Sequence, residues 1–310
     1  MEKVCANGSS WFMSRLLVGV GLACMVFAAQ PTPASGAEQE EPVYKGPAVG
    51  RRVFLSSDLI ASYNALGLGL FTTIIDRRVY DVSEEMGIEW SYLQTGAGFM
   101  VSPAYAQGSV HVEWQPAAFL QLRGDYTMFG FFGMQGGLRG VDSPDSAYDF
   151  DRDSSLPGSD KPSLGHRGLF RPVLAAQVGP VVLRNQLDLA LFSVDTKQPL
   201  FYELEYDYLL ERTDLLIFNQ TQLLFELWKA PREALLLAGA IYDVTHSVET
   251  AIDRQRAGLV VVWQPRDPWG PLDRFRLFLV AGWIIEDRNR KDEPFFIIGV
   301  GTDKDLIQRP

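Results

Sequence analysis

His111 and Glu113 have side chains that could carry chemistry, and only one residue separates them. If this stretch forms a β-strand, alternation places both side chains on the same face. An imidazole next to a carboxylate can relay a proton or bind a cation. Polar side chains at this spacing also line wet interiors, and that simpler role is the one we expect for both residues.

Asp149, Asp151 and Asp153 place three carboxylates at every second residue, and Asp160 follows them. Calcium-binding loops use alternating acids and a later bidentate acid, with a glycine at the sharp turn. Ser154 stands where that glycine is needed. We therefore expect an Asp-rich external loop and no metal site here, with calcium binding by these four acids as the alternative.

His246 and Ser247 have the residue types of a hydrolase pair, in which a histidine activates a serine nucleophile. Adjacent residues of a strand point to opposite faces, so these two side chains should not meet. His166 falls in a predicted loop and carries no signal. The chain has no phosphate-binding loop, dinucleotide fingerprint, metalloprotease motif or nucleophile elbow, so we expect neither an enzyme nor a cofactor.

The elements that must carry these residues follow a repeated pattern. Three times, an alternating run of apolar and polar residues ends on a Trp, turns near a Pro and starts again. A Trp at the end of an apolar strand face is typical of a lipid interface, where its ring lies at the level of the headgroups. We expect a membrane girdle made of Trp114, Trp228, Trp263, Phe275 and Trp283.

Turn signals divide the chain into about twelve strands, within a range of ten to fourteen. The predicted strands are 52–63, 66–75, 86–100, 105–115, 118–130, 168–179, 181–194, 214–228, 233–247, 254–264, 272–286 and 293–302. The three Trp–Pro turns and the turn at 178–181 then all follow even-numbered strands, as they should if they share one side of a membrane. We assign 201–212 to a loop to preserve this order, although its alternation alone is typical of a strand.

The polar faces of these strands predict a lumen. The residues that we expect to line it are His111, Glu113, Gln121, Arg123, Asp125, Arg184, Gln186, Asp188, Gln220, Gln222, Glu226, Arg274 and Arg276. A one-residue slip would turn these side chains toward lipid, where an arginine at the midplane costs about 2–4 kcal/mol. The stretch 235–241 is apolar on both faces, so a barrel would need a plug, a packed interior or a narrow lumen beside it.

Acids and aromatic residues are mixed between positions 201 and 214. Aromatic rings at the mouth of a barrel can bind sugars or other ring-shaped ligands. The alternative is that this segment is a strand whose tyrosines belong to the external girdle.

The N-terminus has the composition of an export signal. Positive residues precede an apolar run at 16–29, and small residues follow up to Ala37, which predicts a cleaved signal peptide over 1–37. Residues 38–51 should then be a disordered periplasmic lead-in, 52–302 the strand domain and 303–310 a polar tail. Both cysteines lie in the signal, so the mature chain should contain no disulfide or thiolate site.

These features together resemble the bacterial outer-membrane β-barrel class over residues 52–302. The resemblance implies an all-β fold, a single antiparallel up-and-down transmembrane barrel, in the outer membrane. It implies membrane lipid, periplasmic chaperones and the barrel-insertion machinery as partners. The polar tail departs from the aromatic end usual in this class. Outer-membrane phospholipases place a His and a Ser two positions apart on one face, which His246 and Ser247 do not match.

The leading functional interpretation is a channel for ions or small solutes. Arginines and acids that pair across a narrow lumen would close it, so a non-conducting structural or adhesion barrel is the alternative. A soluble secreted β-sheet binding protein explains 235–241 better, but it leaves the leucine faces exposed to water. The formal net charge of −10 and the lack of a basic stripe argue against a nucleic-acid partner.

Overall fold

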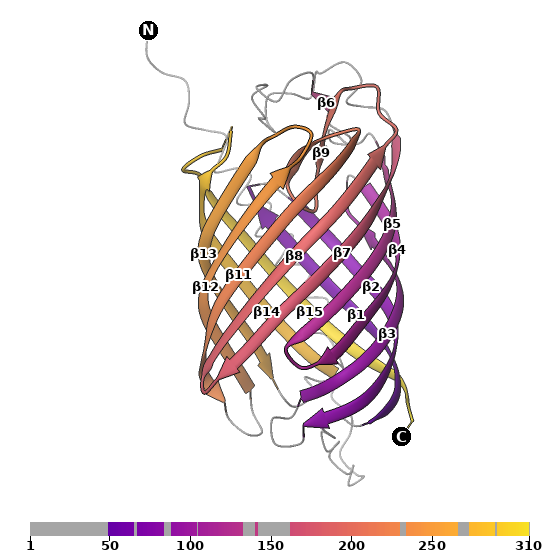
Figure 1. The fold of residues 1–310 in the computed structure, drawn as a ribbon, viewed down its shortest axis with the longest axis vertical. Helices are drawn as coiled ribbons and strands as arrows, with labels where there is room; N and C mark the ends of the chain where they lie inside the picture. Colours follow the sequence, from indigo (N-terminus) through magenta and orange to yellow (C-terminus); the bar gives the residue numbers. More distant parts are fainter. Residues whose placement is uncertain are drawn as a thin grey trace, which may run out of the picture. The chain divides into compact units, whose positions relative to one another are not determined.

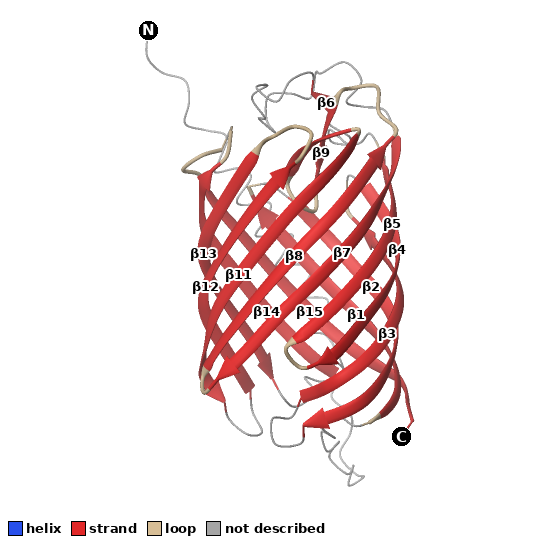
Figure 2. Ribbon diagram, viewed as in Figure 1, coloured by secondary structure: helices blue, strands red, loops and turns tan. Residues whose placement is uncertain are grey.

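The computed structural model describes residues 49–64, 67–83, 88–103, 105–132, 140–141, 162–229, 234–265, 273–288 and 290–309. Every regular element in these ranges is a β-strand (Figure 2). A search of the described residues finds no helix that is long and apolar enough to cross a membrane. The predicted signal peptide and the calcium candidates Asp149, Asp151, Asp153 and Asp160 lie outside these ranges.

Twelve strands close into one antiparallel barrel, as the sequence predicted (Figure 1). Each strand pairs with its neighbours along the chain, and the first pairs with the last. The barrel strands are β1 (Gly50–Tyr63), β2 (Gly67–Ser83), β3 (Ile88–Val101), β4 (Tyr105–Ala117), β5 (Leu120–Phe131), β7 (Ser163–Val178), β8 (Val181–Val194), β11 (Thr213–Lys229), β12 (Ala234–Ser247), β13 (Asp253–Pro265), β14 (Asp273–Glu286) and β15 (Pro294–Arg309). Three short strands form a second sheet: β6 (Gly140–Val141), β9 (Leu200–Glu203) and β10 (Tyr208–Glu211).

The two ends of the barrel differ, and we name them by what they carry. The terminal end holds Gly50 and Arg309, together with the β2–β3, β4–β5, β7–β8, β11–β12 and β13–β14 connections. All three Trp–Pro turns therefore lie at this end, as the parity of the strands predicted. The hairpin end holds the remaining connections, including the long ones that contain β6, β9 and β10.

Side chains alternate between the two faces of the barrel wall. Large apolar side chains on the outer face are exposed, among them Val112, Leu183, Leu191 and Phe225. The inner face carries most of the buried polar side chains. Inside β12, Leu237 and Ile241 pack in a cluster with Leu224, Val260, Val280, Ile284 and Phe295. The inner face of this apolar strand is thus covered by a packed patch of wall side chains.

Three strand boundaries differ from the prediction. β2 continues to Ser83, beyond the predicted end at 75. β7 begins at Ser163, so His166 lies in a strand and not in a loop. β15 continues to Arg309 and includes the segment 303–309 that we predicted as a polar tail. The acids of that segment are ion-paired, because Asp303 pairs with Arg276 and Asp305 pairs with Arg52.

Candidate functional site

The segment predicted as a loop at 201–212 forms a hairpin inside the barrel. β9 pairs antiparallel with β10, and the turn between them ends at Asp207, which has a φ of 57°. Its rings and aliphatic side chains pack on inward-facing wall residues, with Phe201 and Tyr206 both against Phe192. The hairpin therefore fills the lumen at the hairpin end. Its tyrosines, which we expected as a ligand platform or an external girdle, are buried in this packing.

One carboxylate of the hairpin binds two arginines from the far wall. Asp207 is 3.2 Å from Arg254 Nη1 on β13 and 2.6 Å from Arg290 Nη1 in the β14–β15 connection. Tyr202 donates a hydrogen bond to the same carboxylate. The guanidinium of Arg254 is fully buried, so Asp207 supplies the negative charge that this buried cation requires.

The tip of the hairpin also binds the opposite part of the wall. Arg167 Nη1 on β7 lies 2.7 Å from Glu205 Oε2. The hydroxyl of Tyr206 donates to Asp188 on β8 at 2.9 Å. Arg171 forms a two-pronged pair with the same Asp188, at 2.6 and 2.7 Å. Ionic and hydrogen-bonded contacts thus tie the hairpin to β7, β8 and β13.

Glu203 is a buried acid within the hairpin itself. It accepts a hydrogen bond from the backbone N–H of Tyr206 at 2.6 Å. Burial, reinforced by repulsion from Glu205, raises its pKa to about 7, while Arg167 opposes the shift. This carboxyl therefore keeps its proton to a higher pH than an ordinary glutamate does.

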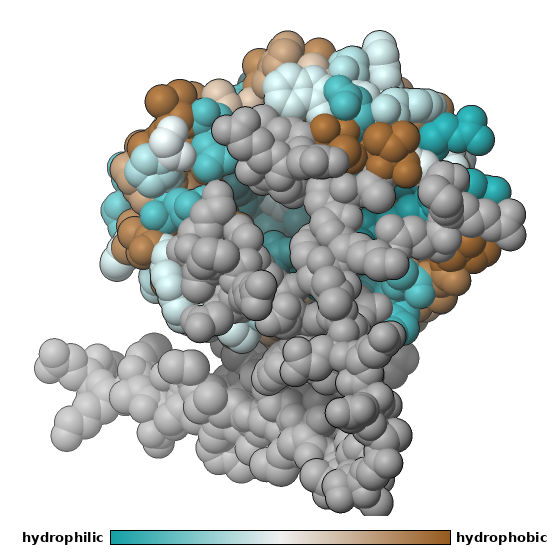
Figure 3. All heavy atoms as spheres, turned by 90° about the horizontal axis from the view of Figure 1, so that it is seen from below, coloured by the Kyte–Doolittle hydropathy of each residue, from teal (hydrophilic) through white to brown (hydrophobic). Residues whose placement is uncertain are grey.

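The terminal half of the lumen has a different organisation. Its arginines pair with acids of the wall: Arg276 with Asp58 at 2.7 Å and Arg52 with Asp305 at 2.5 Å. Viewed from this end, hydrophilic side chains are visible in a recess in the middle of the barrel, and the outer rim carries apolar side chains mixed with hydrophilic ones (Figure 3). Both pairs join strands of the wall: Arg52 on β1 binds Asp305 on the adjacent β15, and Arg276 on β14 reaches across β15 to Asp58 on β1.

The predicted lumen residues lie on the inner face of the wall. His111 is 5% exposed, and neither of its ring nitrogens has a hydrogen-bond partner among the described residues. Glu113 accepts hydrogen bonds from Tyr92 at 2.7 Å and from Gln121 at 2.6 Å. The structure brings His111 and Glu113 to one face without a hydrogen bond between them.

The other predicted lumen residues form three groups. Arg123 pairs with Asp125 at 2.8 Å beside His111. Arg184 and Gln186 lie directly opposite Gln222 and Gln220 on the neighbouring strand, next to Asp188. Arg274 contacts Asp305 at 3.3 Å near the terminal end, close to Arg276, while Glu226 lies near the same end of β11. No group of His, Cys, Asp or Glu side chains suited to a metal ion occurs within the described ranges.

Four of the predicted girdle residues lie where a girdle requires, and one does not. Trp114 and Trp228 are half exposed near the terminal end, and Trp283 is exposed near the hairpin end. Trp263 is partly exposed on the same side as Trp114. Phe275, however, is only 5% exposed and packs edge-to-face on Trp263, with 5.9 Å between the ring centres. The strand register shifts between Asp273 and Arg276, which directs Phe275 against its neighbour.

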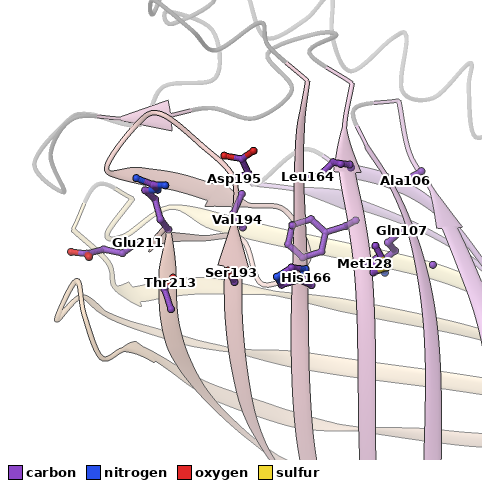
Figure 4. A pocket seen from close by; sticks show the side chains of 15 residues that line it. Ala106, Gln107, Met128, Leu164, His166, Ser193, Val194, Asp195, Glu211 and Thr213 are labelled. Carbon is purple, nitrogen blue, oxygen red and sulfur yellow. The ribbon is translucent and has the colours of Figure 1, made fainter.

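His246 and Ser247 lie on opposite faces of β12. His246 is exposed and bonds Asp253 at 2.8 Å, whereas Ser247 is buried and donates to Asp214 at 2.6 Å. His166 instead faces outward and stands opposite Ser193 in the β7–β8 register. His166 and Ser193 line an outer cavity of about 950 Å³ near the hairpin end, beside Thr213 (Figure 4).

Sequence reasoning missed the arginines that bind the hairpin. Arg167 fell in a predicted loop, and Arg254 stood at the predicted start of a strand. The only sequence signal for these arginines is that they alternate with apolar neighbours, which places their side chains on the inner face of a strand.

Comparison with known proteins gives only distant structural similarity. No protein-family model matches the chain. No curated protein matches it. The β domain of the Bordetella autotransporter BrkA aligns with a TM-score of 0.39 and 11% identity, over 82% of this chain and 98% of that one. An outer-membrane channel from Pseudomonas putida F1 aligns with a TM-score of 0.39 and 9% identity, over 86% of this chain and 100% of that one. LpxR from Salmonella typhimurium aligns with a TM-score of 0.37 and 11% identity, over 80% of this chain and 99% of that one.

These similarities are weak, so the class of the protein rests on its own architecture. A closed antiparallel barrel with an exposed apolar belt and a charged interior is the architecture of bacterial outer-membrane β-barrels. Closure leaves no unpaired strand edge, which is the condition for crossing a bilayer with strands. Inside this barrel, the β9–β10 hairpin packs on the wall at the hairpin end.

Proposed function

We propose that this protein is a channel of the bacterial outer membrane and that the β9–β10 hairpin closes its lumen. The terminal end would face the periplasm and the hairpin end the outside, because such barrels have short periplasmic turns and longer external connections. Membrane lipid would surround the belt, and periplasmic chaperones and the insertion machinery would deliver the chain.

The observation that carries this proposal is the way in which the hairpin is held. Here, buried arginines of the wall bind Glu205 and Asp207 of a short segment that is not part of the barrel. Buried ion pairs gain little net stability, because desolvation offsets their attraction. Such contacts specify a seated position without making release prohibitive.

The interior below the hairpin suits ions and small polar solutes. Its wall carries both arginines and acids, so selectivity for the sign of the solute charge should be weak. Twelve strands enclose a narrow lumen, which limits the size of what can pass.

Conductance of the purified protein in planar bilayers tests the proposal. The wild-type barrel should be closed most of the time, with brief openings. A variant in which residues 200–211 are replaced by a short Gly/Ser linker should conduct steadily. Resistance to cold SDS, lost on boiling, shows that each variant is folded.

A folded deletion variant that stays silent would contradict the channel. The protein would then be a non-conducting structural or adhesion barrel, whose interior remains closed by pairs such as Arg276 with Asp58. The exposed apolar belt argues against a soluble secreted protein, because it would leave a large apolar surface in water. A lipase-type role at His246 and Ser247 has no support, because their side chains lie on opposite faces.

A further inference from the structure

A cluster of polar side chains lies on the outer face of the barrel, in the middle of the apolar belt. Asn185 on β8 stands opposite Thr221 on β11, and Asn219 stands opposite Leu187. These positions are near the centres of both strands, so they lie near the middle of the membrane. Leu183 and Leu223 form the next outward-facing row on one side. An amide at this depth is costly unless its hydrogen bonds are made.

The three side chains bond mainly to one another. The Asn185 amide donates to Thr221 Oγ1 at 2.9 Å and to Asn219 Oδ1 at 3.2 Å. The Asn219 amide donates to Asn185 Oδ1 and to the Gln186 carbonyl, both at 3.2 Å. All four amide protons are therefore used within the barrel.

One donor and several acceptor positions are left over. Thr221 accepts from Asn185, and its own hydroxyl proton has no acceptor among the described residues. Each asparagine carbonyl oxygen can accept a second hydrogen bond. Lipid tails can satisfy none of these groups, so the free energy favours a polar partner at this surface.

We propose that this face binds a second copy of the chain, and that Thr221 of each copy donates to an asparagine carbonyl of the other. A cluster with one free donor beside free acceptors is complementary to itself across a two-fold axis, as an interface between identical subunits requires. The surrounding leucines would pack against the same leucines of the partner. This association goes beyond the channel proposal and holds whether or not the barrel conducts.

The test compares the self-association of three proteins in detergent micelles. Sedimentation equilibrium in density-matched detergent measures the dimer constant of the wild type, of N185L/N219L/T221V and of S57A/T72V. Ser57 and Thr72 form a matched control, since they are an outward-facing polar pair, 3.4 Å apart, on the opposite side of the barrel. All substitutions place apolar groups toward lipid, so folding should be preserved, and cold-SDS resistance checks it.

We expect the wild type and S57A/T72V to dimerise equally and the triple variant to dimerise at least tenfold more weakly. A spin label at L183C should also report a short distance between copies, whereas one at L70C, on the opposite side, should not. A wild type that stays monomeric at every concentration would overturn the proposal. So would a triple variant that associates like the wild type, or an L183C label that reports no partner.

Discussion

The two halves of the lumen use buried charge in different ways. At the hairpin end, Arg167, Arg254 and Arg290 bind carboxylates on a segment that is separate from the barrel. At the terminal end, Arg276 and Arg52 bind carboxylates of the wall itself. The first arrangement holds a hairpin that is not part of the ring, and the second joins strands of the ring. Similar residue types therefore fix an inserted segment in one half and connect wall strands in the other.

Solvent exposure differs between the Arg254–Asp207 pair at the hairpin end and the Arg276–Asp58 pair at the terminal end. The Arg254 side chain is fully buried and that of Asp207 nearly so, whereas the side chains of Arg276 and Asp58 are 31% and 25% exposed. An unpaired charge is costly where water is excluded and much less so where water can replace the partner. The effects of breaking these pairs should therefore decrease from the hairpin end to the terminal end.

Asp207→Asn should have the largest effect. It removes the carboxylate that pairs with the buried guanidinium of Arg254 and leaves Arg290 with Asp287 alone, at 3.4 Å, which costs about 3–5 kcal/mol. We expect the population with a released hairpin to increase a hundredfold or more, seen as higher open probability in bilayers. Amide hydrogen exchange over 200–211 should increase in parallel.

Asp253→Asn is the matched control for this change. Asp253 lies at the same end but is exposed, and it pairs with His246 on the outer face. It should leave both conductance and hairpin protection unchanged. Equal protection of the hairpin in Asp207→Asn and wild type would show that the two halves do not differ as argued.

Release of the hairpin should depend on pH through Glu203. Its pKa is about 7 when seated and near the ordinary 4.5 when released, so the seated state binds more protons. Seating is therefore most favoured below pH 4.5 and weakens as the pH rises toward 7. The groups that face Glu203 are Glu205 on the hairpin, Arg167 on β7 and Tyr105 on β4.

Open probability measured from pH 5 to pH 8 checks this dependence. The wild type should open roughly tenfold to a hundredfold more often at the higher pH, and Glu203→Gln should remove most of the change. A Glu203→Gln barrel that keeps the full pH response would assign the titration to another group.

The wall at the boundary of the two halves is tested by Gly96→Ala. A Cβ at Gly96 would lie 2.3 Å from Cε1 of His111, whereas a Cβ at the lipid-facing Gly124 would meet nothing within 4 Å. We expect Gly96→Ala to destabilise the barrel by about 1–3 kcal/mol and Gly124→Ala to have little effect. Urea unfolding in detergent measures both. His111→Ala should restore stability in the Gly96→Ala background if the clash is the cause.

The parts of the fold that follow from local alternation could be predicted. In β8, Leu183 and Leu191 face lipid while Arg184 and Asp188 face inward, because side chains of a strand alternate whatever its partner is. The shared side of the three Trp–Pro turns followed from the same periodicity, since each strand reverses direction.

The parts of the fold that depend on contacts between residues far apart in the chain could not be predicted from the sequence. The alternation at 201–212 is typical of a strand, but β9 is buried on both faces, so this pattern does not mark it as a strand inserted into the lumen. Asp305 belongs to an acidic segment that is polar by composition, and it is ordered by Arg52, 253 positions away in the chain. Asp207 likewise meets Arg290 only because the barrel closes around it. Such pairings are set by the fold and leave no local pattern.

Arg276→Gln should have the smallest effect on stability and on open probability. It tests the comparison of the two halves of the lumen from the terminal end. Arg276 pairs with Asp58 and with Asp303, and these side chains are partly solvated, so the loss of each pair should cost no more than about 1 kcal/mol. Because neither pair holds the hairpin, the open probability should equal that of the wild type. In the linker variant that lacks 200–211, however, the lumen loses one positive charge, and selectivity should shift slightly toward cations in a salt gradient. An Arg276→Gln protein that opens as often as Asp207→Asn would mean that terminal-end charges also control the hairpin, and the division of the lumen into a half that fixes an inserted segment and a half that connects wall strands would be wrong.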